Sequence, residues 1–181
     1  MGPREIETAR LVLRPLVPGD FEAIHRLWTE PGVRRYLWDG EIIPPEKART
    51  MLVRSAESFA EHGFGLWGMA LRGTEDLIGF SGFWPAGEDG RGGELLYGLG
   101  TPYWGEGLAT EAARAMIRYG FEGLGLERIV AGANTANGAS LRVMEKAGMS
   151  RDGRDLRNGH DLTHYSLSRA AFSGSATGAP G

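Results

Sequence analysis

The feature that most constrains the fold is a long amphipathic helix entered through a glycine-rich loop. The loop, Trp104–Thr110 (WGEGLAT), holds two glycines and an alanine within five residues. Over 106–123 the charged residues Glu111, Arg114, Arg118 and Glu122 recur at spacings of three and four and form one stripe. The rest of the helix surface is a wide apolar face. Alternating apolar residues predict strands at 94–100 and 127–134 on either side of this helix. A helix that connects two strands in this way predicts that they are parallel neighbours.

The rest of the chain supplies further strands and helices of one domain. Apolar periodicity, with proline and glycine at the ends, predicts strands at 10–16, 64–71, 76–84 and 163–169 and helices at 18–30, 44–62 and 137–148. Asp20 is expected to cap the first of these helices. No linker or repeat divides the chain, so we expect a single mixed α/β domain over 1–169. The loop 87–93 is expected to be mobile, and 170–181 to be a disordered tail.

The composition excludes several classes of protein. A net charge of −3 without a dense basic run argues against a dedicated nucleic-acid binder. No apolar run approaches the ~20 residues of a membrane helix, and the N-terminus lacks the apolar core of a secretory signal. Without cysteine there is no disulfide, thiolate nucleophile or cysteine metal site, and the four histidines lack metal-ligand spacing. We therefore expect a cytoplasmic protein that needs no metal.

The glycine-rich loop has two interpretations. The first N–H groups of a helix have no partner within the helix, and the helix dipole favours negative charge there. Gly105 and Gly107 would let an anion such as a diphosphate approach these groups closely. The alternative is a tight turn that binds nothing. No Lys-Ser/Thr follows the glycines and no GxGxxG is present, so the ATP and NAD loops fit poorly.

The wider context favours the anion site. The segment 94–149, with YWGEGLATEA, NGAS and EKAGM in this order and spacing, resembles the GNAT superfamily of acetyl-CoA-dependent N-acetyltransferases. It is most similar to the branch of the ribosomal-protein alanine N-acetyltransferases and related small-molecule enzymes, and the likeness extends over nearly the whole chain except the tail. The resemblance implies a GNAT fold: a twisted, mostly antiparallel sheet flanked by helices, whose one parallel strand pair splays apart to admit acetyl-CoA.

The reaction implied by the resemblance is direct attack of a neutral primary amine on the thioester carbonyl. Such a reaction needs a base for the incoming ammonium and a donor for the leaving thiolate. Glu94 is the implied base, acting directly or through water; the alternative is a solvent-facing carboxylate. Many members carry a tyrosine in helix 137–148 as the acid, but the matching residue here is Met144. Ser140 is therefore the implied donor to sulfur, and the alternative is a serine that bonds only to backbone.

The resemblance also implies a set of residues that bind acetyl-CoA as co-substrate. These are Leu99, Trp104, Gly105, Glu106, Gly107, Leu108, Ala109, Thr110 and Asn137. Trp104 stands where many members have glutamine or arginine, so its side chain is expected to contribute packing alone. Asn137 is expected both to cap its helix and to lie beside the pantetheine arm.

The sequence leaves the acceptor open. A protein N-terminus and a small-molecule amine both fit, because 33–43 and 152–161 carry no recognisable specificity motif. His160 and His164 flank the last strands, near the expected acceptor entrance. We expect no nucleic-acid or membrane partner, and a homodimer is compatible with the sequence. The alternative function, suggested by Met144, is a catalytically weak acyl-CoA-binding module with a regulatory role.

Overall fold

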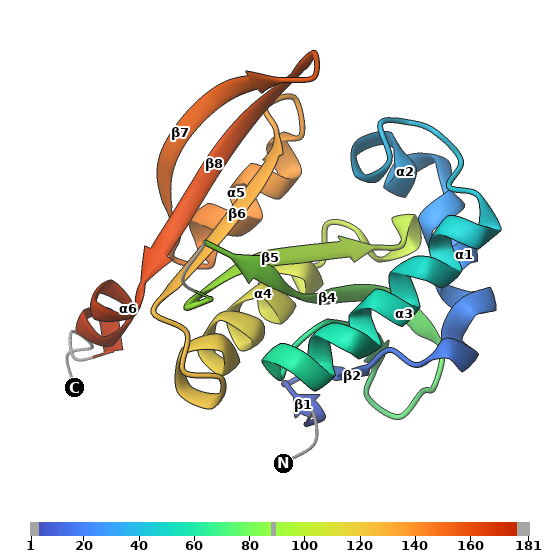
Figure 1. Ribbon diagram of the computed structural model, residues 1–181, viewed down its shortest axis with the longest axis horizontal. Helices are drawn as coiled ribbons and strands as arrows, with labels where there is room; N and C mark the ends of the chain where they lie inside the picture. Colours follow the sequence, from blue (N-terminus) through green and yellow to red (C-terminus); the bar gives the residue numbers. More distant parts are fainter. Residues whose placement is uncertain (1–3, 88–89, 177–181) are drawn as a thin grey trace.

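The structure, a computed structural model, describes residues 4–87 and 90–176 and is built on one eight-stranded sheet (Figure 1). Its strands, in spatial order, are β1 (Ile6–Glu7), β2 (Leu11–Pro15), β3 (Leu66–Leu71), β4 (Leu77–Ala86), β5 (Gly92–Leu99), β6 (Arg128–Asn134), β8 (His160–Ser168) and β7 (Ser150–Arg157). Every neighbouring pair is antiparallel except β5 and β6, which are parallel. The predicted fold class is confirmed.

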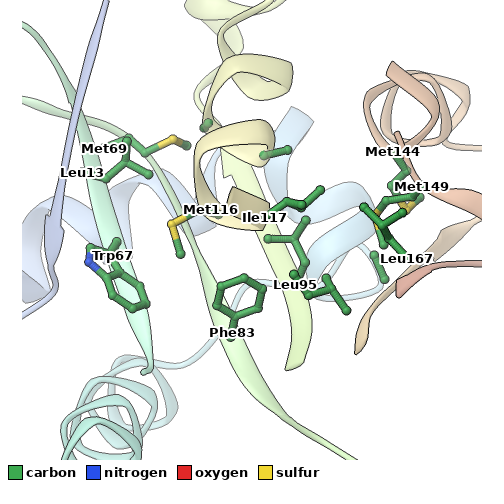
Figure 2. Packing of buried hydrophobic residues seen from close by; sticks show 14 of the residues in the cluster. Leu13, Trp67, Met69, Phe83, Leu95, Met116, Ile117, Met144, Met149 and Leu167 are labelled. Carbon is green, nitrogen blue, oxygen red and sulfur yellow. The ribbon is translucent and has the colours of Figure 1, made fainter. Parts of the chain in front are cut away.

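Helices cover both faces of this sheet. One face carries α1 (Phe21–Thr29), α2 (Pro31–Leu37) and α3 (Pro45–His62), and the other carries α4 (Leu108–Arg118) and α5 (Gly138–Lys146). Side chains alternate along β3, so Leu66 packs into the α1–α3 cluster while Trp67 packs into the α4 cluster. Figure 2 shows Met116 and Ile117 of α4 lying over side chains of the sheet. The wide apolar face predicted for this helix is therefore buried.

Strands β5 and β6 pair over a short distance and then part. Their register contains three pairs: Gly92 with Arg128, Gly93 with Ile129, and Glu94 with Val130. Beyond Glu94, β5 stays bonded to β4 as far as Leu99, and β6 stays bonded to β8 as far as Asn134. The gap therefore opens inside an otherwise continuous sheet, as the predicted splayed pair requires.

The glycine-rich loop determines where α4 begins. Gly105 and Gly107 have φ angles of +81° and +79°, a left-handed conformation that residues with a Cβ rarely adopt. The helix therefore starts at Leu108 and not at Glu106 as predicted. Its α-helical part ends at Arg118 and continues as a π-helical turn, Tyr119–Gly123.

Other elements differ from the prediction. Strands β1 and β7 and helix α2 were not predicted, because each is short or dominated by polar residues. Asp20 precedes α1, but its carboxylate pairs with Arg14 at 2.7 Å and accepts a hydrogen bond from the N–H of Val17 at 2.8 Å. Its side chain therefore does not cap the helix. Of the loop 87–93, residues 88–89 lie outside the described residues, and Gly92 already belongs to β5.

The tail prediction is wrong for residues 170–176. These residues belong to α6 (Arg169–Ala176), and the ring centroid of Phe172 lies 5.0 Å from that of the buried Phe121. An aromatic contact with a residue far back in the chain thus orders a segment whose composition is small and polar. The remainder of the predicted tail, 177–181, lies outside the described residues.

Phe172→Ala tests whether this contact stabilises the domain. Truncating a fully buried phenylalanine to alanine lowers the free energy of unfolding by about 3–5 kcal/mol. Because Phe172 is only half-buried, we expect its truncation to lower the free energy of unfolding by about 1–2 kcal/mol. Urea denaturation measures the change. The matched control is Leu156→Ala, at a side chain that is 75% exposed, where an effect within about 0.5 kcal/mol is expected. Equal stabilities of the two variants would show that α6 does not contribute.

Candidate active site

A cleft of about 530 Å³ occupies the gap between β5 and β6. Its walls are the diverging parts of these two strands, the glycine-rich loop with the first turn of α4, the segment from Ala136 into α5, and one side of α2. Its volume lies within the range typical of small-molecule sites. The parting of the strands therefore creates this hollow.

The glycine-rich loop forms one end of this cleft. A Cβ added at Gly105 would meet no atom within 4 Å, and one added at Gly107 would approach only the Nη2 atom of Arg10, at 3.7 Å. The backbone of the loop is therefore open to a ligand. Of the nine predicted binding residues, eight line the cleft; Glu106 does not, and its carbonyl instead accepts a hydrogen bond from Arg10 at 2.9 Å.

Trp104 does more than pack. Its indole Nε1–H donates a 2.6 Å hydrogen bond to the carbonyl of Leu99, which fastens the loop to the last residue of β5. The ring also lies against α2, since a Cβ added at Gly32 would come within 2.9 Å of it. The expectation of packing alone is therefore corrected: Trp104 connects the loop to both neighbouring elements.

A hydrogen-bonded cluster braces the loop from the N-terminal side. The carboxylate of Glu111 accepts hydrogen bonds from Thr8 Oγ1 at 2.6 Å, Arg10 N at 2.8 Å and Arg10 Nε at 2.7 Å. Burial by itself would raise the pKa of Glu111, but these hydrogen bonds and the charge of Arg10 outweigh it and lower the pKa. Arg10 thus connects Glu111 of α4 to the loop carbonyl of Glu106, so that the distant N-terminal segment fixes the loop.

The N-terminus of α5 brings Ser140 to the cleft. The side chain of Asn137 accepts a hydrogen bond from the N–H of Ser140 at 3.2 Å, which confirms the predicted cap. The hydroxyl of Ser140 lies 2.8 Å from the phenol oxygen of Tyr97 on β5. Burial raises the pKa of Tyr97 to about 12, although the hydrogen bond with Ser140 opposes the shift. Tyr97 was missed in the sequence, where only its alternation within the strand was visible.

Glu94 stands at the point where the strands part. It is the last residue of β5 that is paired with β6, it is exposed, and it lines the cleft. Because side chains alternate along a strand, Glu94 and Tyr97 leave β5 on opposite faces. The gap between the strands is where these two faces meet, so the cleft has one wall with a carboxylate and another with two hydroxyls.

Two cations on α5 were also missed. Arg142 and Lys146 are one helical turn apart, exposed, and both line the same cleft as the glycine-rich loop. In the part of the chain that the structure describes, neither side chain has a hydrogen bond or ion pair with another residue. The spacing of four on a short helix was the signal that could have identified them.

A smaller hollow of about 180 Å³ adjoins the cleft on the side of α2. It shares Tyr36 and the end of β6 with the cleft and adds Arg35, Asp39 and His160. His160 Nε2 lies 3.4 Å from Asp39, whereas His164 Nε2 lies 2.8 Å from Asp155 and does not line either hollow. Of the two predicted histidines, only His160 therefore reaches this region.

Neither a metal centre nor a membrane span is evident in the described residues. Over 4–87 and 90–176 no group of three or more histidine, cysteine, aspartate or glutamate side chains could hold a metal ion. No helix within the same ranges is long and apolar enough to cross a membrane.

Comparison with known proteins identifies the family. Residues 10–150 match the acetyltransferase (GNAT) domain. The uncharacterized N-acetyltransferase YoaA of Bacillus subtilis is 34% identical over 148 residues, which cover 82% of this chain and 84% of that protein. A solved GNAT-family acetyltransferase of Bacillus anthracis is similar with a TM-score of 0.79 and 26% identity, over 92% of this chain and 99% of that one.

A further solved structure shares the fold. RimL, a ribosomal L7/L12 alpha-N-protein acetyltransferase in complex with coenzyme A, has a TM-score of 0.79 at 18% identity, over 91% of this chain and 98% of that one. The family match and the likeness to YoaA show that the chain belongs to the GNAT family of acetyltransferases. It is an acetyl-CoA-dependent N-acetyltransferase.

Glu111→Gln tests the brace behind the loop. The lowered pKa means that ionised Glu111 stabilises the fold above its unfolded pKa of about 4.3, and that this contribution disappears as the pH falls through the folded pKa. The variant should therefore be less stable than wild type at pH 7, and the two should converge as the pH falls through the folded pKa of Glu111 and its carboxylate becomes protonated. Thermal unfolding across this range measures the difference. The exposed Glu122→Gln is the control, and a constant difference at every pH would contradict the assignment.

Proposed function

We propose that acetyl-CoA lies in the cleft between β5 and β6, with its diphosphate at the glycine-rich loop, and that a primary amine attacks the thioester from the side of Glu94. The observation that carries this proposal is the opening of the sheet beyond Glu94 into a cleft that both the loop and the two cations of α5 line. Backbone N–H groups at the start of α4 face the same hollow as Arg142 and Lys146. A doubly charged diphosphate is complementary to both walls.

The two faces of β5 suggest how the reactants divide the cleft. Tyr97 and Ser140 lie on the face of α4 and α5, where the loop would hold the CoA. Glu94 lies on the other face, that of α2, whose residues also line the smaller hollow, and an amine can approach from this side. In this arrangement Glu94 accepts the proton that the ammonium must lose, directly or through water. Ser140 donates a hydrogen bond to the thiolate as it leaves.

The acceptor remains a choice between a protein N-terminus and a small-molecule amine. Release of free thiol across a panel of amines and N-terminal peptides distinguishes them. Turnover with any member of the panel also excludes the alternative of a regulatory module that only binds acyl-CoA. A cytoplasmic location, the absence of a metal and of a nucleic-acid partner, and a homodimer stay predictions.

Gly107→Glu tests the position of the diphosphate. The change places a carboxylate where the diphosphate should lie, so CoA affinity measured by calorimetry should fall at least about tenfold, or ~1.4 kcal/mol. Gly73→Glu is the matched control: Gly73 also has a left-handed φ, of +82°, and open space around it, but it lies in the β3–β4 turn and not in the cleft. Equal CoA affinities in the two variants would refute the placement.

Glu94→Gln tests the proposed base. A base matters most when the amine arrives protonated, so the rate should fall mainly below the pKa of the acceptor amine. Positioned bases contribute about 10²–10⁴-fold, and we expect the lower end for an exposed carboxylate. The pH–rate profile of thiol release measures the effect, with the exposed Glu122→Gln as the control. An unchanged profile would give Glu94 the role of a surface carboxylate.

A further inference from the structure

Tyr97 and Ser140 meet at the cleft although 43 residues separate them in the chain. The phenol oxygen of Tyr97 lies 2.8 Å from Ser140 Oγ and 2.9 Å from the carbonyl oxygen of Ser140. Both residues line the hollow between β5 and β6. This contact joins β5 to the first turn of α5 across the cleft.

The two hydroxyls have one hydrogen each, which limits how they can be arranged. In one arrangement the phenol donates to the Ser140 carbonyl and the serine donates to the phenol, so no hydrogen faces the cleft. In the other, the phenol donates to Ser140 Oγ, and the serine hydrogen is free to point outward. The carbonyl does not need the phenol, because a carbonyl at this place in a helix accepts the N–H of the residue four positions on. An anion in the cleft favours the second arrangement.

We propose that Tyr97 is a positioning residue: its phenol donates to Ser140 Oγ and thereby turns the serine O–H toward the sulfur of CoA. The proposal rests on the proposed function, since it takes the sulfur to lie between β5 and α5. In this arrangement the sulfur accepts a hydrogen bond from Ser140 of α5, whose hydroxyl is oriented by the phenol of Tyr97 on β5. Tyr97 acts on the sulfur through the serine.

The pair acts by hydrogen bonding and not by giving up the phenol proton. With a pKa of about 12 for Tyr97 and about 8.5 for a free thiol, transfer of that proton to the thiolate is unfavourable by roughly three orders of magnitude. The thiolate therefore leaves as an anion held by Ser140 and takes its proton from water. The position at which the family often carries a tyrosine acid supplies no proton here either. It is occupied by Met144, which is 1% exposed and does not line the cleft.

Binding of CoA and of desulfo-CoA, which lacks the sulfur, tests the proposal without any acceptor amine. The wild type should bind CoA more tightly at pH 9.5 than at pH 6.5, relative to desulfo-CoA, because the pair favours the thiolate. Tyr97→Phe should remove about three- to tenfold of that gain and leave desulfo-CoA affinity unchanged. Ser140→Ala should remove at least as much, and the double variant should lose no more than Ser140→Ala alone.

The matched control is Tyr119→Phe, at a tyrosine that packs on Trp67 outside the cleft and should change neither ligand. If Tyr97→Phe keeps the full pH-dependent gain, the proposal is wrong. If it weakens CoA and desulfo-CoA equally, Tyr97 only supports the wall and the proposal is also wrong. If the wild type binds neither ligand, the proposed function fails and takes this inference with it, which distinguishes that failure from the other two.

Turnover supplies an independent readout once an acceptor is found. Because the sulfur becomes charged only as it leaves, Tyr97→Phe should lower kcat and leave the KM for acetyl-CoA unchanged. A raised KM with unchanged kcat would overturn the positioning role.

Discussion

The site depends on the way β5 and β6 stop pairing while each keeps its other neighbour. After Glu94 the inner edges of the two strands have no strand partner, yet β4 and β8 hold the outer edges in register. Buried backbone groups require hydrogen-bond partners, so such an opening is stable only where solvent or a ligand can reach it. The outer edges of both strands are therefore fixed by their neighbours, while the backbone groups of their inner edges are available to a ligand that lies extended between them.

Neighbouring elements hold the glycine-rich loop at the end of this cleft in place. The N-terminal strand region, through Thr8 and Arg10, bonds to Glu111 and so fixes the start of α4. Trp104 fastens the same loop to the end of β5. Side-chain hydrogen bonds thus connect β5, the loop and α4 on either side of two left-handed glycines. A loop held in this way presents its backbone N–H groups without first having to be ordered, which favours binding.

The sequence predicted those elements whose signals lie close together in the chain. The strand–loop–helix–strand unit was recognisable because its glycines, apolar face and strand alternation all lie within 94–134. Strand β7 was not, because its sequence SRDGRDLR is almost wholly polar and every residue is exposed; the Asn158–Gly159 turn, with φ of +51° and +80°, was the overlooked signal. Tyr97 with Ser140, and Phe172 with Phe121, depend on contacts between distant segments, which periodicity does not reveal.

The exposed strand β7 also affects how copies of the protein meet one another. It is the last strand of the sheet, and among the described residues no strand pairs with its outer edge. Such an edge can recruit the strand of another chain and seed aggregation. Here charges of both signs follow one another closely along β7: Arg151, Asp152, Arg154, Asp155 and Arg157. A foreign apolar strand would have to desolvate these groups, so the end of the sheet is protected by its own hydration.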